Sequence, residues 1–207
     1  MAPRTDYGAV IADPPWPYRN NGVNGAAATH YPTMSIVEIC ALPVADWCAA
    51  DAVLYLWTTW PQLEDSMKVV RAWGFEYVTG LPWIKIAEPP QRDMFGEKPL
   101  RPTFGTGWWV RGCSEPILIA KRGHAKRPEV AHVGLLSERF AHSRKPDSVH
   151  ELAEQHPGPY LELFARRARK GWDAWGNEIV SDAVFEHPLA TSAVQQCVAL
   201  AAEGEQQ

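Results

Sequence analysis

The stretch YGAVIADPPWPYRN, residues 7–20, places an acid, two prolines and a tryptophan directly after an apolar run. Pro14 and Pro15 have fixed φ angles and no backbone N–H, so their carbonyls can only accept hydrogen bonds. The Asp13 carboxylate beside a proline carbonyl forms a pair of acceptors, which suits a substrate amino group with two N–H donors. Trp16 adds a flat face for stacking.

An amino group on a heteroaromatic base is planar and a poor nucleophile, because its lone pair is delocalised into the ring. Two acceptors that hold both hydrogens favour a more pyramidal nitrogen, whose lone pair can attack an electrophile. The alternative is an ordinary exit from a strand, since Asp-Pro often begins a turn. The position of the motif directly after a buried strand favours the chemical interpretation.

Short apolar segments bounded by turn residues predict five strands, and helical patterns lie between them. The alternation indicates an α/β fold with a mostly parallel sheet and helices on both faces. In such a sheet ligands bind beyond the carboxyl ends of the strands, where Asp13 follows the first strand. The predicted strands are 8–13, 52–59, 76–85, 115–122 and 160–166, and the predicted helices are 35–40, with a capping box from Ser35 to Glu38, 61–74, ending at Gly74, and 145–156, with Asp147 as a cap.

Residues 86–114 and 123–142 are rich in Pro, Gly and charge, so we expect functional loops there. We expect one catalytic domain over residues 1–180. The acidic, alanine-rich residues 181–207 predict a loosely ordered tail.

The formal charge of −4 is unevenly distributed along the 207 residues. Residues 1–84 hold 4 basic and 8 acidic residues, residues 85–170 hold 16 and 10, and residues 171–207 hold 0 and 6. The basic middle segment, net +6, could meet phosphates, or it could be a solvated surface. The four cysteines lie in no CxxC pair, which predicts reduced thiols and no metal site. With no signal peptide and no apolar run of about 20 residues, we expect a cytoplasmic protein without a membrane span.

The ADPPW motif resembles the catalytic signature of the MT-A70-type N6-adenine methyltransferases, which use S-adenosyl-L-methionine. Further blocks follow in that family's order, and the likeness covers most of the chain, residues 8–178. The blocks are YPTMS (31–35), LYLWTT (54–59), WGFEYVTGLPWIK (73–85), GTGWWVRGCSEPILIAKRG (105–123), HSRKPD (142–147), LELFAR (161–166) and GWDAWGNE (171–178). The resemblance implies a Rossmann-like methyltransferase fold, permuted so that the catalytic strand comes first.

The resemblance also implies a role for each matching residue. Asp13 and the Pro14 carbonyl, within the catalytic segment that Pro15 and Trp16 complete, would accept from the target N6, and Asp13 would also face the amino end of the cofactor. The adenine pocket would be lined by Tyr31, Trp83 and Glu115. The cofactor would be held by Lys145 at its carboxylate and by Glu162, Arg166, Asn177 and Glu178 at its ribose hydroxyls and neighbouring polar edges. An acid inside an apolar strand needs a partner, which supports Glu162.

The leading hypothesis is therefore methyl transfer from S-adenosyl-L-methionine to adenine N6 in DNA, of bacterial or phage type and with limited sequence specificity. The alternatives are an RNA adenine-N6 methyltransferase and a catalytically inactive nucleic-acid-binding partner of the same family. A single-stranded or flipped adenine is the expected substrate form. The sequence leaves open a homodimer or a paired subunit.

Overall fold

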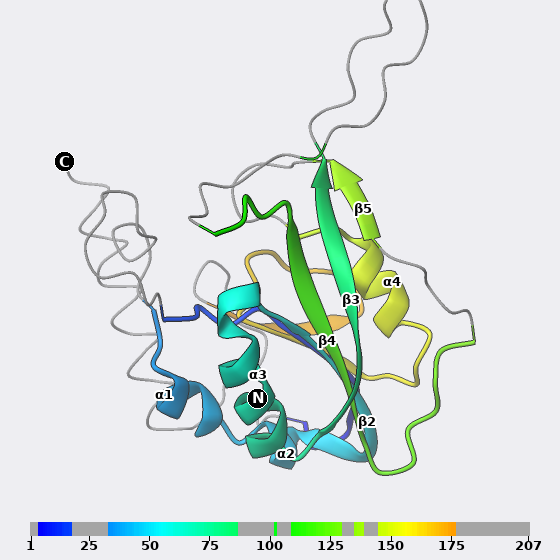
Figure 1. Cartoon of the computed structure of the whole chain (residues 1–207). Helices are drawn as coiled ribbons and strands as arrows, with labels where there is room; N and C mark the ends of the chain where they lie inside the picture. The colour runs from blue at the N-terminus through cyan, green and yellow to red at the C-terminus, as the bar shows by residue number, and fades with distance from the viewer. Residues whose placement is uncertain are drawn as a thin grey trace, which may run out of the picture.

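Seven strands of the described residues form one sheet, with the order β5-β3-β4-β2-β1-β6-β7. Figure 1 shows β5, β3, β4 and β2 of this sheet. The computed structural model describes residues 4–17, 33–86, 102, 109–129, 135–138 and 145–176. The strands are β1 (Tyr7–Ala12), β2 (Cys48–Trp57), β3 (Glu76–Ile86), β4 (Ser114–Arg122), β5 (Leu135–Glu138), β6 (Tyr160–Leu163) and β7 (Trp172–Trp175). The helices are α1 (Ile36–Cys40), α2 (Val44–Trp47), the 3₁₀-helix η2 (Trp60–Gln62), α3 (Leu63–Ala72) and α4 (Ser148–Ala153).

The sheet is mostly parallel, as predicted. β1 runs parallel to β2 and β6, β6 to β7, and β3 to β5. Only β4 runs against its neighbours, β2 and β3. All six residues of β1 are buried, because the strand is paired on both sides and covered on both faces.

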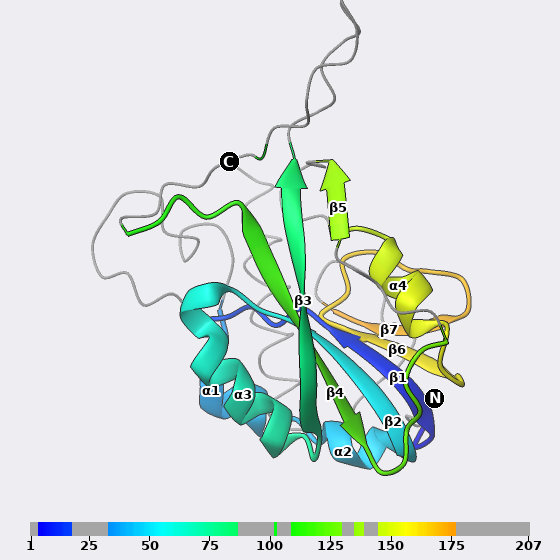
Figure 2. The ribbon, with the colours of Figure 1, turned by 45° about the vertical axis from the view of Figure 1, so that its right-hand side comes forward.

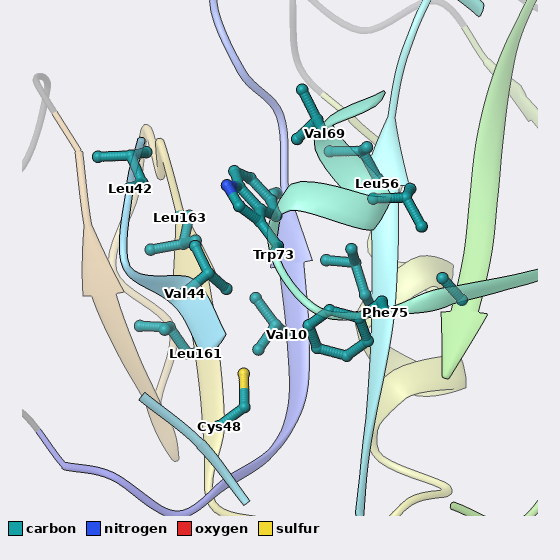
Figure 3. Close-up of a cluster of buried hydrophobic side chains, with 14 of the residues drawn as sticks. Val10, Leu42, Val44, Cys48, Leu56, Val69, Trp73, Phe75, Leu161 and Leu163 are labelled. Atoms are coloured by element: carbon teal, nitrogen blue, oxygen red, sulfur yellow. The ribbon is translucent and has the colours of Figure 1, made fainter. Parts of the chain in front are cut away.

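Helices cover both faces of the sheet, which confirms the predicted layers (Figure 2). Successive strand residues point to opposite faces, so Val10 and Leu56 pack toward α3, where Val69 and Trp73 meet them (Figure 3). On the other face, a second cluster packs against α4. It contains Ile11, Tyr55, Trp57, Val149 and Leu152. Each such side chain contributes about 1.5–3 kcal/mol of burial free energy, so the two clusters fix the sheet between its helices.

Most predicted elements are confirmed, and the differences lie at their ends. The last predicted strand, 160–166, ends at Leu163, because Phe164 has a φ of 63°, outside the extended region. The helix 61–74 begins as η2, continues as α3 and stops before Gly74, whose φ of 78° suits glycine. The capping box of α1 is present, with Ser35 and Glu38 each accepting from the other's backbone N–H.

The third helix is shorter than predicted, and its cap differs. Asp147 occupies the N-cap position of α4 but accepts no hydrogen bond from the helix through its side chain. Its carboxylate instead forms ion pairs with Arg167 and, at 3.5 Å, with Arg169. Guanidinium donors from a segment far along the chain therefore outcompete the helix N–H groups.

Three short elements were not predicted from the sequence. β5 lies inside the segment 123–142, which we expected to be a loop, and α2 and β7 are each four residues long. Such short elements carry too little periodicity to be recognised, and the two strands are formed by pairing at the sheet edges. The predicted tail at 181–207 lies outside the described residues. No helix of the described part of the chain combines the length and the apolar character that crossing a membrane requires.

Candidate active site

Several of the predicted site residues lie at one edge of the sheet. Asp13 follows the last residue of β1, and Trp57 ends β2. Because β4 runs antiparallel to β2, its first residues arrive at this same edge, so Glu115 lies there too. In the β3–β4 ladder Glu115 is directly opposite Trp83. The reversal of β4 thus places a second carboxylate beside the carboxyl ends of the parallel strands.

A chain of alternating charges connects these strand ends. The Lys145 Nζ lies 3.1 Å from an Asp13 carboxylate oxygen and 3.0 Å from Glu115 Oε2. The other Glu115 oxygen accepts a hydrogen bond from Lys85 Nζ. The order of charges is therefore Asp13, Lys145, Glu115 and Lys85, with two negative and two positive groups in contact.

The surroundings keep the two central groups of this chain charged. Burial by itself raises the pKa of Glu115, but the ammonium groups of Lys145 and Lys85 bring that pKa below its ordinary value. Burial by itself lowers the pKa of Lys145, whereas the carboxylates of Asp13 and Glu115 raise it above its ordinary value. Lys145 is therefore held as an ammonium and Glu115 as a carboxylate.

Two tryptophan rings line the inner side of the charge chain. Trp57 and Trp83 meet edge to face, with ring centroids 5.6 Å apart. Lys145 Nζ lies 4.9 Å from the centre of the Trp57 ring, and Lys85 Nζ lies 5.0 Å from that of Trp83. The indole N–H of Trp83 is buried and has no hydrogen-bond partner among the described residues. Two buried indole rings, one of them with this unused N–H donor, therefore border the carboxylates.

The prolines after Asp13 are fixed by backbone hydrogen bonds. The Pro14 carbonyl accepts from the Trp16 N–H at 2.8 Å, and the Pro15 carbonyl accepts from the Met34 N–H at 3.0 Å. A carbonyl has two lone pairs, so Pro14 keeps a second acceptor position. The turn thus has a defined shape before any ligand binds.

Trp16 has a different role from the one the sequence suggested. Its side chain is only 7% exposed and belongs to the cluster between the sheet and α3. Its indole N–H donates to the Trp57 carbonyl at 3.0 Å. The expectation of an open stacking face at Trp16 is therefore wrong. The ring anchors the segment after β1 to the end of β2, and so holds Asp13 at the edge.

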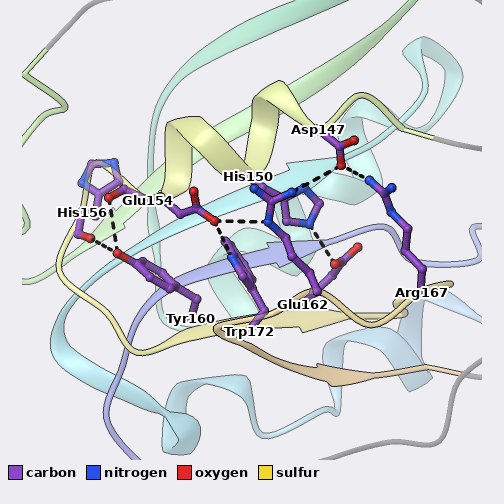
Figure 4. A network of polar contacts seen from close by, with 9 residues as sticks. Asp147, His150, Glu154, His156, Tyr160, Glu162, Arg167 and Trp172 are labelled. Atoms are coloured by element: carbon purple, nitrogen blue, oxygen red, sulfur yellow. Dashed lines mark hydrogen bonds and ion pairs between the residues drawn. The ribbon is translucent and has the colours of Figure 1, made fainter.

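A second polar network joins α4 to β6 and β7 (Figure 4). His150 Nε2 lies 2.8 Å from Glu162 Oε2, so the acid within the β6 strand has the partner that its position demanded. Glu154 accepts from the Trp172 indole at 2.8 Å and from Arg169 at 3.2 Å. This network fixes the helix that follows Lys145.

The structure brings together only part of the predicted site. Asp13, Trp83, Glu115 and Lys145 share one edge. Glu162, on the neighbouring strand β6, is paired with His150 of α4. Arg166 is exposed. Tyr31, Asn177 and Glu178 lie outside the described residues.

Among the members of these clusters that sequence reasoning missed are Lys85, which pairs with Glu115, and His150, which pairs with Glu162. Lys85 had a signal, since it lies two residues after Trp83 in the same strand and so shares its face. His150 had none, because only the docking of α4 brings it to Glu162.

Comparison with known proteins agrees with this geometry. A family model described as MT-A70 matches residues 7–178. The type II methyltransferase M.MunI of a Mycoplasma species is 32% identical over 201 residues, which cover 86% of this chain and 79% of that protein. The N6-methyladenosine RNA methyltransferase MTA1 of Cryphonectria parasitica is 30% identical over 198 residues, and the N(6)-adenine-specific methyltransferase METTL4 of Mus musculus is 26% identical over 188 residues. The matches cover 88% and 87% of this chain, but only 53% and 38% of those two proteins.

Proposed function

Since the chain belongs to the MT-A70 family of methyltransferases, we propose that it methylates the N6 amino group of adenine in DNA, with S-adenosyl-L-methionine as the methyl donor. The observation that carries this proposal is the position of Asp13. Its carboxylate stands at the end of a buried strand, next to the Pro14 carbonyl, and is held there by Lys145 at 3.1 Å.

The side chains of the edge fit the cofactor by their chemistry. The amino-acid end of S-adenosyl-L-methionine carries one carboxylate and one ammonium, and the edge offers the Lys145 ammonium beside two carboxylates. Lys145 would hold the cofactor's carboxylate, and Asp13 its amino end. Glu162, Arg166, Asn177 and Glu178 would hold the ribose hydroxyls and neighbouring polar edges. When bound, the cofactor supplies a methyl group made electrophilic by its sulfonium.

The residues of this chain orient and activate the amino group. Asp13 and the second lone pair of the Pro14 carbonyl would accept its two N–H groups, which favours a more pyramidal nitrogen whose lone pair is less delocalised into the ring. Positive charge develops on this nitrogen as the new N–C bond forms, and the Asp13 carboxylate would stabilise that charge until one N–H proton is released to give neutral N6-methyladenine. An interaction of this kind raises the rate constant by a factor of about 10²–10³.

The adenine would lie against Tyr31, Trp83 and Glu115, the residues that the sequence predicts around it. A base in a duplex must first leave the stack, at a cost of a few kcal/mol, whereas a single strand avoids much of that cost. DNA is favoured because the bacterial relative at 32% identity is a type II methyltransferase. RNA is the second candidate, since MTA1 is an RNA methyltransferase at 30% identity.

The test is transfer of a labelled methyl group to single-stranded DNA, duplex DNA and RNA by the full chain and by Asp13→Ala. We expect labelled N6-methyladenine in DNA, and a loss of about 10²-fold or more in Asp13→Ala. Glu115 still holds Lys145 in this variant, so it should fold. Asp46→Ala is the matched control, because Asp46 is exposed and precedes β2 at the opposite edge of the sheet.

Each other outcome has a defined meaning. Equal labelling by wild type and Asp13→Ala would refute the role of the carboxylate. Labelling of RNA alone would replace DNA with RNA as the substrate. Failure of calorimetry to detect cofactor binding by the wild-type chain would favour a nucleic-acid-binding partner without catalysis.

A further inference from the structure

Trp60 is an exposed tryptophan at the edge of the sheet that carries Asp13. Seven of the nine tryptophans within the described residues are no more than 7% exposed, whereas Trp60 is 53% exposed and Trp109 fully so. Trp60 begins η2, three residues after Trp57, the last residue of β2. An exposed indole offers a flat apolar face on which another planar ring can stack.

The indole of Trp60 is held in place although its ring is exposed. Its N–H donates to the Ser114 hydroxyl at 3.1 Å. Pro61 restricts the backbone on one side, and the Trp60 carbonyl accepts from the Leu63 N–H. A ring fixed in this way loses little conformational entropy when a partner covers it.

Ser114, which accepts the hydrogen bond from the Trp60 indole, directly precedes Glu115 in the chain. Ser114 and Glu115 are consecutive in β4 and point to opposite faces of the sheet. Glu115 faces Lys145 beside α4, so Trp60 lies across the rim on the α3 side. A strand of nucleic acid that places one base against Asp13 and Glu115 therefore brings a neighbouring base to this rim.

An exposed basic side chain lies near the same edge. Arg111 is three residues before Ser114, whereas the charge of Lys85 is already paired with that of Glu115. A guanidinium suits the phosphates between successive bases, and an exposed indole suits the face of a base. The combination fits single-stranded nucleic acid better than the apolar surface of another protein.

We propose that Trp60 is a stacking platform for the base next to the target adenine in single-stranded or locally opened DNA. The proposal rests on the proposed function, because it places the target adenine at Asp13. It adds a contact outside the adenine pocket, which would bind the flanking base by its face and with little sequence preference.

Binding is measured first, by fluorescence anisotropy without cofactor. The probe is a short labelled single-stranded DNA with one central adenine, compared with probes in which the base before or after the adenine is replaced by an abasic spacer. We expect one spacer to weaken wild-type binding about 5- to 150-fold, and Trp60→Ala to lose a similar factor on the intact probe. In Trp60→Ala the same spacer should cost nothing further, because both changes remove one contact.

Two variants separate stacking from other roles of the side chain. Trp60→Phe keeps an aromatic face but loses the bond to Ser114, and should retain most of the binding. Tyr77→Ala removes another exposed aromatic side chain, 42% exposed near the start of β3 and thus at the opposite edge, and should bind like wild type. The spacer experiment on wild type needs no variant, so a misfolded Trp60→Ala would not weaken the test.

The proposal is overturned if neither spacer weakens wild-type binding, if spacer and variant losses multiply, or if Trp60→Ala changes the oligomeric state instead. The methyl-transfer assay separates this result from the proposed function. If methyl transfer occurs and does not depend on Trp60, the stacking role of Trp60 is refuted and the methyltransferase function stands. If DNA binding depends on Trp60 but no methyl group is transferred, the stacking role stands and the methyltransferase function is refuted.

Discussion

We expect Lys145→Met to lower the free energy of unfolding by about 2–4 kcal/mol at neutral pH. The ammonium contacts Asp13 at 3.1 Å and Glu115 at 3.0 Å. At an effective dielectric constant of about 20, each contact represents about 5 kcal/mol of Coulomb energy. Desolvation of the ammonium offsets several kcal/mol of this sum, and the two carboxylates, each about a fifth exposed, regain some hydration when it is removed.

The loss of stability in Lys145→Met should become smaller as pH falls. Lys145 and Lys85 hold the pKa of Glu115 below its ordinary value against the effect of burial. In wild type the Glu115 carboxylate therefore stabilises the fold at pH values above the ordinary pKa of a glutamate. This stabilisation is lost as pH falls through the lower pKa that Glu115 has in the folded protein. In Lys145→Met burial is opposed by Lys85 alone, so the pKa of Glu115 rises and protonation relieves the buried charge. The difference between variant and wild type should therefore shrink between neutral pH and about pH 4.

Urea unfolding followed by tryptophan fluorescence measures this difference at each pH. Arg4→Met is the matched control, because Arg4 and Asp6 also pair at 3.1 Å but are more than half exposed. Its free energy of unfolding should equal that of wild type within error. A loss in Lys145→Met no larger than that of the control, or one that grows toward acid pH, would refute the reasoning.

Two further predictions concern the scaffold. Gly8→Ala should lower stability by about 3 kcal/mol in urea unfolding, because a Cβ would overlap the carbonyl oxygen of Pro157, whereas Gly112→Ala, with open space around it, should match wild type. Burial lowers the pKa of His156, which is hydrogen-bonded to the Tyr55 hydroxyl at 2.9 Å, so wild type should lose stability as pH falls below about 6.5. His156→Gln should lose less stability than wild type between about pH 7 and pH 5. An unchanged dependence of the unfolding free energy on pH would contradict this role of His156.

The sequence by itself determined where Asp13 lies. An apolar run predicts a buried strand, and the residue after a parallel strand lies at the ligand-binding edge, so the position of Asp13 followed from local pattern alone. The capping box at Ser35 and the helix end before Gly74 were equally predictable, because each depends on neighbours within a few residues.

Only the tertiary structure decided the partners of these groups. Lys145 pairs with Asp13 and Glu115 because α4 docks on one face and β4 runs against its neighbours. Trp16 is buried because its indole N–H finds the carbonyl of Trp57 on another strand. Charge and hydrogen-bond energies depend on distances of a few ångströms, and residues far apart in the chain reach such distances only through register, strand direction and helix docking.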